Sequence, residues 1–173
     1  MKHLTKDELS KMLAVAQSSG PLDYLIILLA FNHGFRVSEV LSLTSENFVD
    51  GHVIVQRLKG SCKTTQKLLP NEAGLITDLL THRSPGERLF PFCRKTAWLH
   101  VKQIGVAAGI ESFRCFPHAL KHTCAMTGLA GGMKINEVQT YLGHKSGAST
   151  MAYLRVDDDV ACKAFAAAAG GSF

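Results

Sequence analysis

Two segments far apart in the chain carry side chains that can bind an anion and move a proton. One spans residues 32–41, NHGFRVSEVL, and the other comprises residues 118–123, HALKHT, followed by YLGH at 141–144. A guanidinium such as that of Arg36 matches two phosphate oxygens in a planar fork. Fixed cations of this kind stabilise the charge that develops on phosphate oxygens when an oxygen nucleophile attacks a phosphodiester. The two segments therefore suit chemistry on a phosphodiester, provided that the fold brings them together.

The same residues resemble the tyrosine recombinase (phage integrase) family. That family is marked by G-[LF]-R-x-S-E-x-L, a lysine in a basic β-hairpin, H-x-L-R-H-T, L-G-H and a tyrosine about nine residues later, and these pieces occur here in order. The resemblance extends over residues 5 to 156. Residues 33–36 (HGFR), 57–59 (RLK) and 64–65 (TT) also resemble the short bacterial recombinases that invert fimbrial promoter segments. The matched positions that the resemblance implies to be catalytic are Arg36, Lys59, His118, Lys121, His144 and Tyr153.

The resemblance implies a separate task for each of these side chains. Tyr153 would attack the phosphodiester, giving a 3′-phosphotyrosyl link and a free 5′-hydroxyl, so that rejoining needs neither ATP nor a metal. Lys59, in the hairpin turn, would protonate the leaving 5′-oxygen. His118 would accept the tyrosine proton or hold the phosphate, and His144 would donate a hydrogen bond to a non-bridging oxygen.

Residue types alone leave alternatives at several of these positions. Lys63 is a second lysine that the same hairpin offers as the acid, and Tyr24 and Tyr141 are the other tyrosines in the chain. Arg36 is one helical turn from Glu39, so a plain surface ion pair is another interpretation of this arginine.

Lys121 departs from the family pattern, which has arginine at this position. Lysine keeps the positive charge but loses the bidentate fork, so it fixes phosphate geometry less well. Removal of one transition-state donor costs roughly 10² to 10³ in rate. Three hypotheses follow: a working variant, a weakened enzyme, or a substitution introduced to trap a complex.

Neither a metal nor a cofactor is expected. His118 and His122 have the i, i+4 spacing of metal ligands on a helix, but no H-E-x-x-H glutamate accompanies them. The five cysteines are widely spaced and contain no C-x-x-C pair. An odd number of scattered cysteines predicts reduced thiols that act as small buried hydrophobes.

Apolar periodicity predicts a mainly helical chain. Thr5 and Glu8 form a capping-box pattern, and the uninterrupted apolar run of residues 25–31 predicts a helix buried on all sides. We expect Asn71 to cap a later helix. The predicted helices cover residues 5–17, 22–33, 37–43, 72–82, 95–108, 118–130, 135–142 and 157–169.

The period changes between residues 53 and 69. Val53 to Leu58 follow a strand pattern, which resumes at residues 67–69 after the basic, glycine-containing stretch 59–65. The sequence therefore predicts a fold that is mainly α with a small antiparallel β-hairpin.

Composition limits the function classes further. The chain has 173 residues, of which 46% are hydrophobic and 19% charged, enough apolar surface for one folded domain. Its net charge of +5 admits nucleic acid as a partner. The longest apolar run is too short for a bilayer span, and no signal peptide pattern is present, which predicts a cytoplasmic protein of the bacterial nucleoid or a phage-infected cell.

Together these observations predict a single catalytic domain over residues 1–173, without an N-terminal DNA-clamping domain. The resemblance implies a site-specific recombinase, of the integrase or invertase type, that acts on double-stranded DNA as a tetrameric synapse, with accessory DNA-binding proteins as further candidate partners. A DNA-binding protein that no longer cuts is the main alternative. A type IB topoisomerase is disfavoured, because such an enzyme must hold the duplex from both sides.

Overall fold

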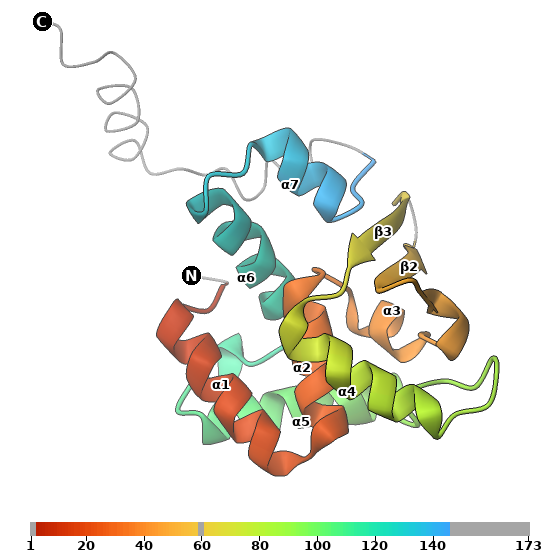
Figure 1. The fold of residues 1–173 in the computed structure, drawn as a ribbon. Helices are drawn as coiled ribbons and strands as arrows, with labels where there is room; N and C mark the ends of the chain where they lie inside the picture. Colours follow the sequence, from red (N-terminus) through yellow and green to blue (C-terminus); the bar gives the residue numbers. More distant parts are fainter. Residues whose placement is uncertain (1–2, 59–60, 146–173) are drawn as a thin grey trace, which may run out of the picture.

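The computed structural model describes residues 3–58 and 61–145 and has the predicted class, mainly α with a small antiparallel sheet (Figure 1). The elements in chain order are α1 Lys6–Ser19, α2 Pro21–Asn32, α3 Val37–Leu41, β1 Phe48–Val49, β2 His52–Gln56, β3 Lys63–Lys67, α4 Pro70–Thr81, α5 Arg94–Ala107, α6 Pro117–Ala130 and α7 Ile135–Tyr141. Single 3-10 turns cover Ser45–Asn47 and Ser112–Arg114. The helix expected over residues 157–169 lies outside the described residues.

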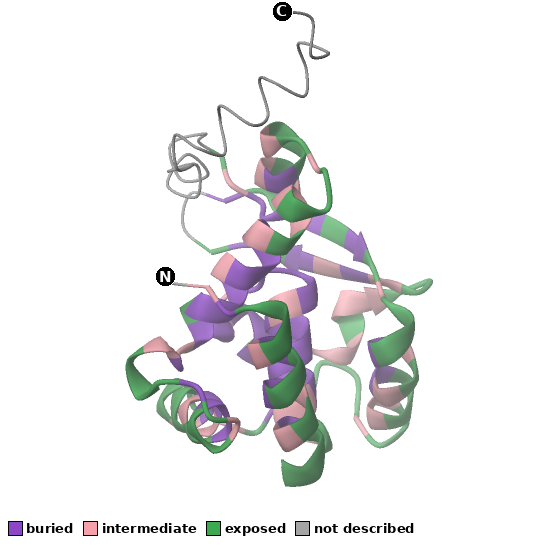
Figure 2. Cartoon of the chain, turned by 90° about the vertical axis from the view of Figure 1, so that its left-hand side faces the viewer, coloured by how far each residue is buried: buried purple, intermediate pink, exposed green. Residues whose placement is uncertain are grey.

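The apolar helix α2 lies at the centre of the molecule, as its composition predicts. Residues 25–30 are all buried, and α2 contacts α1, α4, α5 and α6. Figure 2 shows the buried residues gathered at the centre, with exposed residues on the outer faces of the surrounding helices. Because α2 ends next to α3, this core fixes the position of the turn that carries Arg36.

The hairpin is a three-stranded antiparallel sheet in the order β1-β2-β3, and its third strand differs from the prediction. β3 occupies Lys63–Lys67 rather than residues 67–69, and its Val55↔Thr64 and Val53↔Gln66 pairs set the register. Thr64 and Gln66 face inward and are buried. The apolar pattern missed this strand because polar side chains fill its inner face.

The cap of α4 also differs from the prediction. Asn71 lies inside the helix, which begins at Pro70. The carboxylate of Glu72 instead accepts the N–H of Leu69 at 2.9 Å and contacts His33 Nε2 at 2.6 Å. Glu72 and His33 are both fully buried, so this pair joins the start of α4 to the end of α2.

The predicted capping box of α1 is confirmed. The Thr5 hydroxyl accepts the N–H of Glu8, and the Glu8 carboxylate accepts the N–H of Thr5 at 2.7 Å. Glu8 also pairs with Arg114, which ties α1 to the turn before α6. None of the described helices is long and apolar enough to cross a membrane.

The cysteines are only partly as expected. Cys115 and Cys124 are buried, but Cys62 and Cys93 are exposed. Cys93 caps α5, where its sulfur accepts the N–H of Thr96, so a polar role takes the place of core packing. Cys162 lies outside the described residues.

Gly34 ends α2 in a conformation that no other residue type fits well. Its φ is +57°, and a Cβ there would collide with the side chain of Leu142 and lie 3.3 Å from Cys124 Sγ. Gly34→Ala should therefore lower the free energy of unfolding by about 2–4 kcal/mol, through left-handed strain and overpacking. Gly51→Ala is the matched control, because Gly51 has a φ of +71° but no atom within 4 Å of its added Cβ. Gly51→Ala should lower the free energy of unfolding, measured by urea denaturation, by only about 1 kcal/mol. Equal losses of stability for both variants would contradict the packing argument.

Candidate active site

The fold brings together four of the six predicted site residues. Arg36 caps the N-terminus of α3, His118 and Lys121 lie on α6, and His144 follows α7. The Lys121 ammonium donates to Gly34 O, two residues before Arg36, at 2.8 Å. Residues 61 and 144 form a β-bridge that joins the hairpin to the segment after α7. Lys59 and Tyr153 lie outside the described residues, so the structure does not place them.

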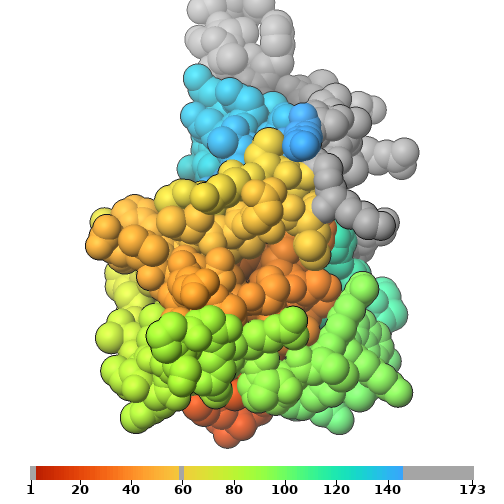
Figure 3. All heavy atoms as spheres, turned by 90° about the vertical axis from the view of Figure 1, so that its right-hand side faces the viewer, coloured from red at the N-terminus to blue at the C-terminus, as the bar shows by residue number. Residues whose placement is uncertain are grey.

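The hairpin borders the site and is bonded to the segment after α7. Figure 3 shows the yellow residues around β3 below the blue α7 and above the orange segment that contains α3. The N–H of Cys62 donates to Gly143 O at 2.9 Å, so the far end of the hairpin turn is bonded to the loop that carries His144. Lys63 is exposed at the start of β3.

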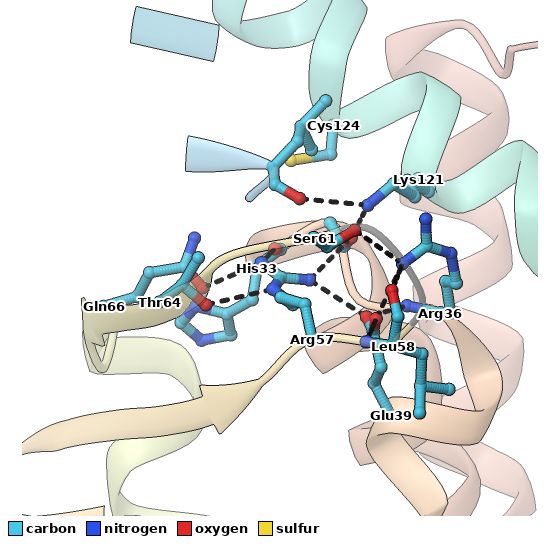
Figure 4. A network of polar contacts seen from close by, with 12 residues as sticks. His33, Arg36, Glu39, Arg57, Leu58, Ser61, Thr64, Gln66, Lys121 and Cys124 are labelled. Atoms are coloured by element: carbon cyan, nitrogen blue, oxygen red, sulfur yellow. Dashed lines mark hydrogen bonds and ion pairs between the residues drawn. The ribbon is translucent and has the colours of Figure 1, made fainter. Parts of the chain in front are cut away.

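Arg36 is held by its own helix and keeps donors available for a ligand. Its Nη1 donates to Glu39 Oε1 at 2.8 Å and makes longer contacts, each 3.4 Å, to Leu58 O and Ser61 Oγ (Figure 4). The ion pair with Glu39 that residue spacing allowed is therefore present. The Nε and Nη2 groups of Arg36 have no partner among the described residues, and the side chain is 31% exposed. An anion can therefore be bound on that edge of the guanidinium.

Lys121 is buried, unlike a lysine that projects toward solvent. Its exposure is 1%, and Nζ donates to Gly34 O at 2.8 Å and to Leu142 O at 3.4 Å. Burial first, and then the charge of Arg57, lowers the pKa of Lys121 to about 7. Near neutral pH, Lys121 is therefore present both as the charged ammonium and as the neutral amine.

Both site histidines are disposed to be neutral. Burial, and then the charges of Lys121 and Arg36, lowers the pKa of His118. The same causes in the same order lower the pKa of His144 to about 4. A neutral imidazole can accept a proton or donate a single hydrogen bond, and it cannot act as an acid at pH 7.

The spacing of His118 and His122 does not produce a cluster of metal ligands. Their rings meet edge to face, with centroids 5.2 Å apart. Among residues 3–58 and 61–145 no third His, Cys, Asp or Glu completes a group with them.

Tyr141 is poorly suited to be the nucleophile. Its hydroxyl donates to Asn32 O at 2.7 Å, and burial is the main cause that raises its pKa to about 12. A tyrosine whose proton is both bonded and hard to remove attacks slowly. Tyr141 therefore joins α7 to the end of α2.

Two charged residues of the site were not predicted. Arg57 and Glu39 form an ion pair of 3.1 Å with both side chains fully buried. Burial acts to raise the pKa of Glu39, but hydrogen bonds from the Arg36 and Leu58 N–H groups and the charge of Arg57 hold it below its usual value. The sequence signal for Arg57 is the RLK stretch at residues 57–59, which resembles the family but does not by itself indicate a buried ion pair.

Comparison with known proteins places this site in context. The family model described as "Phage integrase family" matches residues 2–159. Among curated proteins, tyrosine recombinase XerA of Pyrococcus furiosus is 33% identical over 173 residues, covering 90% of this chain and 57% of XerA. Type 1 fimbriae regulatory protein FimE of Escherichia coli is 28% identical over 171 residues, covering 88% of this chain and 84% of FimE. The chain thus spans little more than half the length of XerA.

Solved structures show the same fold. The crystal structure of XerA recombinase matches with a TM-score of 0.79 and 24% identity, covering 94% of this chain and 63% of that one. XerH recombinase bound to palindromic difH substrate, in a post-cleavage complex, matches with a TM-score of 0.80 and 20% identity, covering 96% of this chain and 52% of that one. The helical arrangement described above is therefore shared with these recombinases.

Proposed function

Because the chain belongs to the phage integrase family, we propose that it cleaves and rejoins double-stranded DNA through a 3′-phosphotyrosyl intermediate. The observation that carries the proposal is the convergence of Arg36, Lys121 and His144 from distant parts of the chain, with Arg36 donors that none of the described residues bonds at the point where they meet. A cationic cluster with free guanidinium donors is the arrangement that stabilises charge on a phosphodiester.

In the proposed reaction, the Tyr153 oxygen attacks phosphorus while its proton passes to His118. The phosphorus–O5′ bond breaks, and Lys59 gives its proton to the departing 5′-oxygen. Arg36 and Lys121 stabilise the non-bridging oxygens, and neutral His144 donates a hydrogen bond to one of them. The 5′-hydroxyl of a partner strand reverses these steps, so no external energy source is required.

We propose that several copies of the protein act together in the full recombination reaction. The described residues form one catalytic domain, which acts in the cytoplasm on bacterial or phage DNA. Four protomers on two sites exchange strands, with accessory DNA-binding proteins where the target requires them. XerH has been solved as a complex with its difH substrate, which supports DNA as the partner.

Incubation of the protein with a DNA duplex nicked beside the cleavage point tests the proposed chemistry. The short fragment leaves after cleavage, so the covalent protein–DNA adduct cannot revert and accumulates on a denaturing gel. We expect an adduct without added ATP or metal. Absence of an adduct with every target tested would instead favour a DNA-binding protein that no longer cuts, a function that the burial of Lys121 makes the second candidate.

DNA affinity should depend strongly on salt. Neutralisation of about six phosphates by one protomer predicts that affinity falls about 10³-fold between roughly 50 and 200 mM salt, because condensed counterions are released on binding. Fluorescence anisotropy measures this dependence directly, and a nearly flat response would contradict phosphate-dominated binding.

Arg36 should account for part of the dependence of DNA affinity on salt concentration. Arg36→Gln should reduce the salt slope by about one, as expected for the loss of one phosphate contact. Arg83→Gln is the matched control, because the Arg83 guanidinium is already bound to Glu87 and Leu89 O. It should leave the slope unchanged.

A further inference from the structure

Arg57 is a buried cation for which the reaction proposed above has no task. Its side chain is fully buried, and its guanidinium carbon lies 4.3 Å from the centroid of the Phe35 ring. All five N–H donors are bonded inside the protein, and Figure 4 shows those to Thr64 and Glu39 among them. The acceptors are Gly34 O and Glu39 Oε2 at 3.1 Å from Nη1, His33 O at 2.8 Å and Tyr141 O at 3.3 Å from Nη2, and Thr64 Oγ1 at 2.9 Å from Nε. No donor remains for a phosphate, so Arg57 can affect the reaction only through other residues.

Glu39 connects Arg57 to the reactive part of the site. One carboxylate oxygen of Glu39 accepts from Arg57 and from the Arg36 N–H, the latter at 2.8 Å. The other oxygen accepts from Arg36 Nη1 at 2.8 Å and from the N–H of Leu58 at 3.1 Å. A single buried carboxylate therefore holds both the Arg36 guanidinium and the backbone that leads into the hairpin turn.

The two residues depend on each other electrostatically. A buried carboxylate without a counter-charge is strongly disfavoured, and it takes a proton or seeks another partner. Without Arg57, Glu39 would keep only Arg36 as a charged partner among the described residues. Arg36 would then be drawn inward to neutralise Glu39, and its donors would turn away from the phosphate.

We propose that Arg57 is a positioning residue for DNA cleavage, which acts by neutralising and orienting Glu39 so that Arg36 presents its Nε and Nη2 donors to the scissile phosphate. The inference rests on the proposed function and deepens it, because it names a residue that controls the reactive geometry without contacting DNA. A displacement of about 1 Å in a group of this kind can cost on the order of 10²-fold in rate.

The first test compares Arg57→Lys with Arg114→Lys. Arg114 also pairs with a carboxylate, that of Glu8, at a nearest distance of 2.5 Å, and it lies in the turn before α6, outside the proposed site. We expect Arg57→Lys to cleave a nicked substrate about 30- to 100-fold more slowly at saturating protein, with DNA affinity within about threefold of wild type. Arg114→Lys should cleave at the wild-type rate once the folded fraction is taken into account. A wild-type rate for folded Arg57→Lys would overturn the proposal.

A double-mutant cycle with Arg36→Lys distinguishes a positioning role for Arg57 from a purely structural one. If Arg57 acts through Arg36, adding Arg57→Lys to Arg36→Lys should slow cleavage by less than about threefold. If Arg57 merely stabilises the fold, its full loss should multiply that of Arg36→Lys, and this result would also overturn the proposal.

Thr64→Val keeps the proposal testable if Arg57→Lys does not fold. It removes only the acceptor of Arg57 Nε, so it should fold and cleave about 3- to 10-fold more slowly, with the same dependence on Arg36. A wild-type rate for Thr64→Val together with an unfolded Arg57→Lys would count against the proposal. Failure of the proposed function itself gives a different result, because the wild-type protein would then form no adduct.

Discussion

The Tyr153→Phe protein should bind DNA as tightly as the wild type and form no covalent adduct with a nicked substrate. Phenylalanine keeps the ring but removes the oxygen that attacks phosphorus, so the chemical step has no nucleophile. The expected effect is a loss of adduct to below detection on a denaturing gel.

Tyr141→Phe is the matched control for that experiment. It removes the hydroxyl that donates to Asn32 O and whose pKa is raised to about 12, and it should lower stability slightly while leaving adduct formation intact. An adduct that persists in Tyr153→Phe and disappears in Tyr141→Phe would reassign the nucleophile. Retention of the adduct in both variants would point to Tyr24 or to a different chemistry.

Lys121→Met should slow cleavage by roughly 10² to 10³, because it removes one cation from the transition state while keeping a side chain of similar length. Lys121→Arg should raise cleavage, since a guanidinium restores the fork that matches two phosphate oxygens. Equal cleavage by all three forms would contradict a role for this residue in the reaction. A loss with arginine would show that the buried space between Gly34 and Leu142 fits only lysine.

The advantage of arginine should grow with pH. The Lys121 ammonium, whose pKa is lowered to about 7, is charged below that pH and neutral above it, whereas a guanidinium keeps its charge. The cleavage rate of Lys121→Arg relative to wild type should therefore rise by about 10- to 100-fold between pH 6 and pH 9. Lys102→Arg, on α5, is the control and should show a constant ratio across this range. A constant ratio for Lys121→Arg would show that the charge of Lys121 does not change during the titration.

The sequence predicted the helices and the meeting of the two motif segments, because both depend on strong local signals. The apolar run of α2 admits only a buried helix, and the capping box of α1 is specified within four residues. The motif segments had to converge if the resemblance was correct, and Lys121 is indeed bonded to Gly34 O. The catalytic roles assigned to Arg36, His118 and His144 remain predictions.

Local sequence signals could not predict the position of β3 or the buried ion pair between Arg57 and Glu39. Arg57 lies near the end of the predicted strand, directly before the basic turn, and nothing local indicates that its charge is buried against Glu39. Thr64 and Gln66 look like surface residues of a hairpin, but their side chains face inward to bond Arg57. A polar interior can be identified only when the partner from another element is known. The sequence predicted Asn71 at the start of α4, where Glu72 accepts the N–H instead, for the same reason: the partner of Glu72 is His33 on another element, α2.

The hydrogen bonds that complete the site join residues very far apart along the chain. Lys121 and Gly34 are 87 positions apart, Arg57 and Tyr141 are 84 apart, and the Leu4 N–H reaches Thr123 Oγ1 across 119 positions. Contacts of such high sequence separation close large loops and therefore form late in folding. During synthesis on the ribosome, α1 and α2 can form early, but the carbonyls of Tyr141 and Leu142, which accept from Arg57 and Lys121, are made only at the end of α7. A nascent chain thus has no assembled phosphate-binding cluster until almost all of the described residues have been made.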